Sequence, residues 1–275
     1  MTKAMKNTVF SARRFMNVLR KEIAVNGRML LLLALGLYMG LTIVMTFGNM
    51  IFSHSFEIPV TLLANVVVYC IAAFVFSIMA SMAFSGLKTR GSRVDLLMMP
   101  ATALEKVLVQ ALVYGVAGVL VFLLCAQLAD LTRIGLMNLL VPSAEIPGPI
   151  NFLAFPYNYA FGVSNYDARV SFGTMLTMAL VASMATYFMG AVLMPRYTWL
   201  KMMVVMQVVD IAIFSVLIIC GRWMNATWIH YITDVNHVDG IGWFFAVLAI
   251  VQAVACAVLA YVFFKRKDVI TRSVI

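Results

Sequence analysis

Six long apolar stretches constrain this chain more than any other feature. Each can cross the hydrocarbon core of a bilayer, which is about 30 Å thick and needs about 20 helical residues. Of the 275 residues, 64% are hydrophobic and only 11% are charged, which is more apolar surface than a soluble interior of this size can hold. We therefore expect an all-α, polytopic membrane protein with six transmembrane helices. The expected spans lie near residues 29–51, 59–84, 104–131, 171–194, 201–220 and 241–264.

The distribution of basic residues predicts the orientation of these spans. Of the 20 lysines and arginines, all but Arg133, Arg169 and Arg222 fall on one side of the predicted bilayer. Because cytoplasmic loops carry the excess of Lys and Arg, both termini are predicted to be cytoplasmic. The net charge of +9 then reflects membrane orientation, and we expect no nucleic-acid partner. The segment 265–275 is predicted to be a basic cytoplasmic tail.

The N-terminal segment, residues 1–28, is predicted to be an amphipathic helix that lies on the cytoplasmic membrane surface. On a helical wheel its basic and apolar residues separate onto different faces, which is typical of helices in the headgroup plane. Two roles remain open, a simple anchor among the membrane lipids and an elbow that also receives a cytoplasmic partner. The basic face comprises Arg13, Arg14, Arg20 and Lys21, and the apolar face comprises Phe15, Met16, Val18, Leu19 and Ile23.

The loop between the second and third spans carries the most specific local signals. Ser92 and Asp95 have the spacing of a capping box, which predicts a short helix over residues 93–99. Pro100 is expected to end this helix, because proline disfavours helical geometry at the residue before it. Thr102 and Glu105 form a second capping box that opens the third span. A short helix at this face is either a handle for a partner or an interfacial turn without one.

Around Pro100 the sequence Leu-Leu-Met-Met-Pro-Ala-Thr-Ala-Leu-Glu-Lys, residues 96–106, resembles the "LLPAS…EK" loop of bacterial ABC transporter permeases. These permeases belong to the type-2 exporter class, and the Bacteroidetes-like members look most similar. The resemblance implies a bacterial inner-membrane permease that pairs with a second permease subunit, as a homodimer or heterodimer. It also implies a separate ATP-binding cassette subunit that holds ATP and magnesium and docks on this loop. The residues that would face that subunit are Arg93, Val94, Asp95, Leu96 and Leu97.

Several catalytic motifs are absent from the sequence. It has no G-x-x-x-x-G-K-[ST] phosphate loop, no G-x-S-x-G, no H-E-x-x-H and no Cys/His spacing of a metal site. We therefore expect no enzyme activity, cofactor or metal in this chain itself, with ATP hydrolysis supplied by the partner subunit. The expected function is the permease half of an ATP-driven exporter. The alternatives are a non-transporting membrane assembly or structural subunit and, third, an intramembrane enzyme.

Polar and small residues within the spans mark further candidates. Asp210 lies at mid-depth in the fifth predicted span, where a carboxylate is costly, and Gln207 lies on the same helix face three residues earlier. The pair either lines a polar path or fixes a helix contact. Gly36 and Gly40 form a G-x-x-x-G pattern in the first span, which allows close helix approach either within one bundle or at a dimer seam.

Overall fold

The computed structural model is all-helical in the residues that it describes. Four of its helices are long and apolar enough to cross a membrane, over Ala12–Gly48, Ala103–Leu140, Gly173–Leu193 and Trp243–Lys267. Two further apolar helical stretches, Val67–Met82 and Thr198–Val209, are shorter within the described part of the chain. The described residues are 10–52, 60–140, 148–149, 152, 166–223 and 238–274, without the side chains of some helical positions such as Leu97 and Asp210.

The helices follow one another along the chain with short connections where these are described. Helix α4, the π-helical segment η2 and α5 form one continuous helix of the third predicted span, whereas η1 and α3 belong to the loop before it. The bounds are α1 (Ala12–Phe52), α2 (Val60–Met82), η1 (Ser85–Leu87), α3 (Arg90–Leu97), α4 (Ala103–Gln110), η2 (Ala111–Val116), α5 (Ala117–Leu140), α7 (Tyr166–Leu193), α8 (Thr198–Trp223) and α10 (Val238–Val274).

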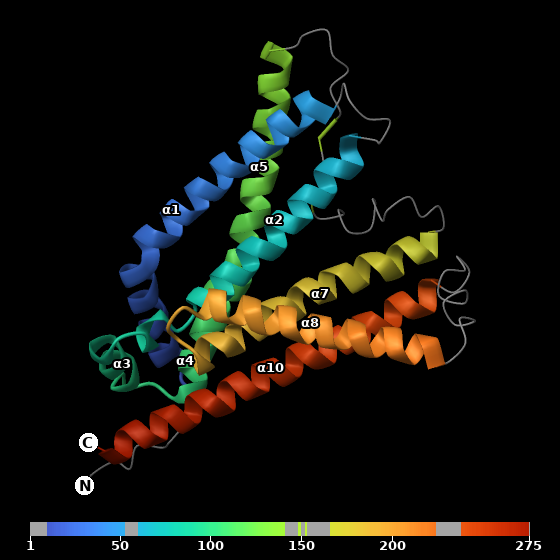
Figure 1. The fold of residues 1–275 in the computed structure, drawn as a ribbon. Coiled ribbons are helices and arrows are strands. Elements are labelled where there is room, and N and C mark those ends of the chain that lie inside the picture. Colours follow the sequence, from blue (N-terminus) through green and yellow to red (C-terminus); the bar gives the residue numbers. More distant parts are fainter. Residues whose placement is uncertain are drawn as a thin grey trace.

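Two groups of helices diverge from the end of the molecule that holds α3 and α4 (Figure 1). One group contains α1, α2 and α5, and the other contains α7, α8 and α10. They meet in a buried apolar cluster to which several helices contribute, including Val18 of α1, Leu96 of α3, Tyr114 of η2 and Phe264 of α10. The start of α1, the end of α10 and the short helix α3 therefore share one end of the protein.

Helix α1 packs in parallel along the continuous helix α4–η2–α5. Near its start the side chain of Arg14 contacts Glu105, 91 residues away in the chain. Towards its other end the hydroxyl oxygens of Thr42 and Thr132 lie 3.4 Å apart, at a separation of 90 residues. The difference in residue number between contacting positions is thus almost the same near both ends of α1. The two helices therefore keep one register along most of their length.

Three boundaries differ from those predicted from the sequence. Helix α1 is continuous from Ala12 through Phe52 across the predicted boundary at residue 28, and its first turns pack on α4 and η2. The predicted tail continues α10 as helix to Val274. The third span extends beyond residue 131 to Leu140, where the charges of Asp130 and Arg133 are paired within the helix.

Candidate functional site

The short helix α3 occupies the loop that the sequence singled out, but it starts earlier than expected. Thr89, not Ser92, is the N-cap: its backbone is extended and its hydroxyl accepts a hydrogen bond from the Ser92 backbone N–H at 3.4 Å. The Ser92 hydroxyl lies 2.6 Å from that of Thr89, so it supports the cap from inside the first turn. The helix ends at Leu97, which is before Pro100 but two residues earlier than the predicted end at residue 99.

Helix α3 presents one face to the outside and one to the interior. The side chains of Arg93, Val94 and Asp95 are exposed. Leu96 is buried, in contrast to the expected outward position, and it packs in the cluster with Val18 and Leu87. The packing of Leu96 in this cluster fixes α3 on the end of the bundle. The side chain of Leu97 lies outside the described residues.

Glu105 joins α1 to the start of α4. The predicted capping box is confirmed, since the Thr102 backbone N–H donates to Glu105 Oε2 at 2.9 Å and the Glu105 backbone N–H donates to the Thr102 hydroxyl at 3.3 Å. The other carboxylate oxygen accepts hydrogen bonds from the Ser11 backbone N–H at 2.6 Å and from Arg14 Nη2 at 3.1 Å. The Glu105 carboxylate is fully buried, so one side chain holds both a helix N-terminus and a second helix.

A second polar contact joins the same two helices further along. Tyr114 of η2 donates a hydrogen bond from its hydroxyl to Glu22 Oε1 of α1 at 3.2 Å. The same oxygen accepts a hydrogen bond from Asn26 Nδ2 at 2.8 Å. Tyr114 lies within the π-helical turn of the third span, a local widening that often accompanies functional positions. The Glu105 and Tyr114 contacts together fix α1 against α4 and η2.

The turn after α2 is held by α4, through Gln110. Phe84 adopts a left-handed backbone conformation with φ of 57°, which is strained for a residue with a bulky side chain. Its backbone N–H donates to Gln110 Oε1 at 3.1 Å. Its buried ring lies 5.1 Å from the ring of Phe264 and at the same distance from that of Phe188. The loop that carries α3 is therefore anchored to α4, α7 and α10.

A small cavity with both polar and apolar wall residues separates α3 from α1. Its volume is about 220 Å³. Its wall includes Lys21 and Glu22 of α1, Ser92 and Asp95 of α3, and Gln110 of α4. Helix α3 thus contacts the bundle through Leu96 and borders this cavity through Ser92, Asp95 and Leu96.

The other predicted site, in α8, is only partly described. Gln207 lies on α8 with its side chain exposed. The side chain of Asp210 lies outside the described residues, so the proposed pairing of the two stays a prediction. Among the described residues no group of three or more His, Cys, Asp or Glu side chains could hold a metal ion.

The sequence analysis did not identify a buried ion pair at the other end of the third span. Arg133 Nε lies 2.8 Å from Asp130 Oδ1, and both side chains are almost completely buried. Arg133 Nη2 also donates to the Gly148 carbonyl oxygen at 3.4 Å. The i, i+3 spacing of opposite charges beside an apolar stretch is the signal that could have found this pair.

Comparisons with known proteins add no family to this geometry. No protein-family model, no curated protein and no solved structure matches the chain.

Proposed function

We propose that this chain is the membrane-spanning permease subunit of an ATP-driven ABC exporter. A separate ATP-binding subunit would carry ATP and magnesium and would dock on α3. The observation that carries the proposal is the placement of α3, which exposes Arg93, Val94 and Asp95 at an end of the bundle while Leu96 anchors it within the core. A short, capped helix of this kind offers a partner a defined surface.

Movement of α3 would be passed on through the contacts at its base. Helix α3 connects to α4 through the turn at Pro100, and α4 is tied to α1 by Glu105. The cavity of about 220 Å³ between α3 and α1 leaves room for a small displacement. In the proposed mechanism, closure of the ATP-binding subunits pushes α3 and biases the helix groups between two arrangements.

The proposal includes a second permease subunit, identical or related. Gly36 and Gly40 of α1 are exposed, and a Cβ atom added at either would meet no described atom within 4 Å. The G-x-x-x-G pattern is thus not used for packing within the described part of the chain. Such a pattern supports close contact with a helix of another subunit. The polar residues Gln207 and Asp210 of α8 remain candidates for a polar path.

The proposed location is the bacterial inner membrane, with both termini in the cytoplasm. The start of α1, α3 and the end of α10 lie at one end of the molecule (Figure 1). Exposed basic residues are found there on each of these elements, including Arg20, Arg93 and Lys265. This agrees with the excess of Lys and Arg expected of cytoplasmic segments.

The test is affinity purification from the native host in mild detergent, with stoichiometric partners identified by mass. The unmodified chain is expected to retain an ATP-binding subunit in equal abundance. The double variant Val94→Asp/Asp95→Arg is expected to lose it, because both side chains are exposed on α3. Arg196→Glu, an exposed charge reversal between α7 and α8, serves as the control and is expected to retain it.

Two results would contradict the proposal. If the unmodified chain is isolated alone or with membrane proteins that bind no ATP, the assembly-subunit alternative replaces the exporter. If an ATP-binding subunit is present but the α3 double variant retains it as well as Arg196→Glu does, the docking surface is not α3.

A further inference from the structure

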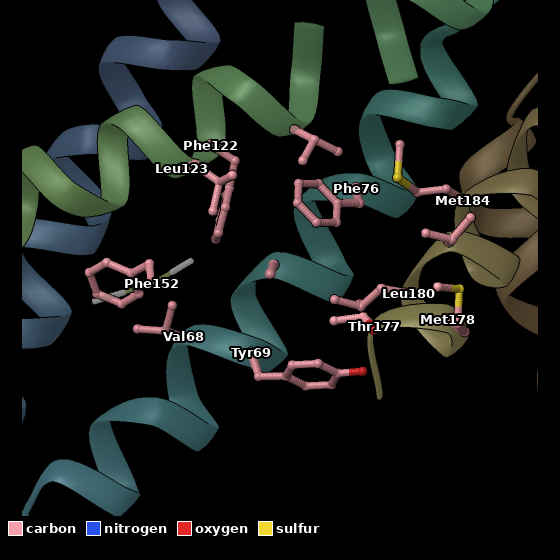
Figure 2. Close-up of a pocket in the computed structure, with 13 residues that line it drawn as sticks. Val68, Tyr69, Phe76, Phe122, Leu123, Phe152, Thr177, Met178, Leu180 and Met184 are labelled. Carbon is pink, nitrogen blue, oxygen red and sulfur yellow. The ribbon is translucent and has the colours of Figure 1, made fainter. Parts of the chain in front are cut away.

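A second cavity, with a volume of about 420 Å³, lies between α2, α5 and α7. The residues that line it come from these three helices and from Phe152, with none from α3 among them. Figure 2 shows side chains of all three helices pointing toward the space, with Phe152 on one side. Its wall is made mainly of Val68, Phe76, Phe122, Leu123, Leu180 and Met184.

The lining offers little to a polar ligand. Tyr69 and Thr177 carry hydroxyls at the wall, but both already donate to backbone carbonyls: Tyr69 to Leu176 at 2.7 Å, and Thr177 to Thr174 at 2.9 Å. A buried water needs two to four polar partners, and apolar cavities without them stay dry or take apolar guests. The cavity therefore favours hydrocarbon over water.

The position of the cavity along its helices adds to this argument. At 1.5 Å per residue, Ala72 of the cavity wall lies about 15 Å or more from either end of α2. Leu180 is similarly central in α7. In apolar membrane helices of these lengths, central positions lie at the depth of the hydrocarbon core.

The cavity is open at one side to that environment. Val181 on its rim is half-exposed, and Leu123 and Leu180 are partly exposed. At this depth the molecules outside the protein are lipid acyl chains. The cavity volume is within the range of ligand sites, about 300–1,000 Å³. Thioether side chains such as Met184 adapt readily to a flexible guest.

We propose that this cavity binds one acyl chain of a membrane lipid, which enters sideways between the two helix groups. The lipid is recognised by its acyl chain and not by its headgroup, because the polar groups of the cavity wall already form hydrogen bonds within the protein. This inference does not depend on the proposed transport function. It assigns the cavity to a lipid that belongs to the membrane, separate from any partner at α3.

The test uses the full chain in phosphatidylcholine liposomes with a trace of phosphatidylcholine that carries a diazirine in the middle of one acyl chain. After illumination, labelled peptides are mapped by mass spectrometry. We expect labelling concentrated in residues 68–76 of α2 and 177–184 of α7, above the level on the exposed apolar face of α10. Diazirine lipids with ethanolamine or glycerol headgroups are expected to label the same peptides equally.

Filling the cavity should remove this labelling. In Ala72→Phe the new ring occupies the cavity, and labelling of the two peptides is expected to fall about tenfold, since the chain loses its contacts with the wall. The control is Ala257→Phe, the same change at an exposed position of α10, which is expected to leave the labelling unchanged. If Ala72→Phe fails to fold, Val181→Trp at the rim narrows the opening and is expected to reduce labelling likewise.

Three outcomes would overturn the proposal. One is labelling spread evenly over exposed apolar faces in the unmodified protein. Another is labelling that persists when the cavity is filled in a folded variant, Ala72→Phe or Val181→Trp. The third is a preference of about tenfold or more for one headgroup, which would place recognition at a polar site elsewhere.

Discussion

Arg14 on α1 and Glu105 at the start of α4 are 91 residues apart in the chain, yet their side chains form an ion pair at 3.1 Å. The Glu105 carboxylate is fully buried, whereas the Arg14 side chain keeps 32% of its surface exposed. The two partners are therefore unequal. Glu105 has several donors from two helices and no access to solvent, and Arg14 can turn back to water when its partner is lost.

The first prediction follows from this inequality. Glu105→Gln is expected to lower the stability of the folded protein by about 1–3 kcal/mol, because charge-assisted hydrogen bonds to a buried carboxylate are replaced by weaker ones. Arg14→Gln is expected to cost less, about 0–1 kcal/mol, as for a pair whose cation is partly solvated. The measurement is the thermal unfolding midpoint in detergent.

Asp95→Asn is the matched control for Glu105→Gln, since it removes an exposed carboxylate from the neighbouring helix. It is expected to leave the midpoint almost unchanged. Equal shifts for Glu105→Gln and Asp95→Asn would contradict the role assigned to Glu105.

The second prediction concerns the buried pair of Asp130 and Arg133. Replacing either residue alone by an apolar one, Asp130→Leu or Arg133→Met, removes the 2.8 Å ion pair while the other charge stays buried. Each single change is expected to lower the free energy of unfolding by about 3–5 kcal/mol. The double variant Asp130→Leu/Arg133→Met is expected to recover most of this loss, since the site then becomes apolar.

A double-mutant cycle on the unfolding midpoints measures the coupling between the two positions. Additive effects of the single changes would show that the pair does not act as a unit. Folding into a different arrangement would be detected by loss of the monodisperse peak in gel filtration.

The third prediction tests the packing between α7 and α8. A Cβ atom at Gly190 would overlap the side chain of Met202, so Gly190→Ala is expected to destabilise the protein by about 1–3 kcal/mol through overpacking. Gly135→Ala in α5 is the control, because Gly135 is exposed and no described atom lies within 4 Å of its added Cβ. It is expected to be neutral or slightly stabilising, since alanine favours helix more than glycine does.

The origin of the effect can be separated from a general loss of helix flexibility. In a Met202→Ala background the side chain that blocks the site is shortened, and Gly190→Ala should then cost much less. If the cost is the same in both backgrounds, the overlap with Met202 is not its cause.

The local elements of this fold could be predicted from the sequence, because their signals lie within a few residues. The Thr102–Glu105 capping box and the helix end before Pro100 are both present. The start of α3 was misplaced because two hydroxyl residues, Thr89 and Ser92, compete for the N-cap, and the sequence pattern does not rank them. Because serine and threonine differ as N-caps by only about a few tenths of a kcal/mol, tertiary packing decides which of the two is used.

The long-range contacts could not be predicted in this way. Nothing local to Glu105 indicates that Ser11 and Arg14 reach it, and these contacts depend on the parallel packing of α1 along the third span. For the same reason the continuity of α1 past residue 28 was missed, since an amphipathic pattern fits a membrane surface and a protein surface equally well. The inward position of Leu96 likewise follows from the packing of α3 as a whole.

The fourth prediction separates the folding role of α3 from its proposed docking role. Leu96 is buried with 6% of its surface exposed, so Leu96→Ala is expected to lower stability by about 2–5 kcal/mol, the usual cost of emptying a buried leucine site. Asp95 is exposed beside it, so Asp95→Arg should change the free energy of unfolding by no more than about 0.5 kcal/mol.

Binding of the ATP-binding subunit and substrate-stimulated ATP hydrolysis should respond in the opposite order. Asp95→Arg is expected to abolish both in a protein that is otherwise intact, because it reverses an exposed charge on the proposed docking surface. Leu96→Ala should reduce both only as far as the folded population falls, and recovery at lower temperature would show this. If the ATP-binding subunit binds Asp95→Arg and its ATP hydrolysis is still stimulated by substrate, the exposed side chains of α3 do not couple the two subunits. This holds even if the helix is needed for the fold.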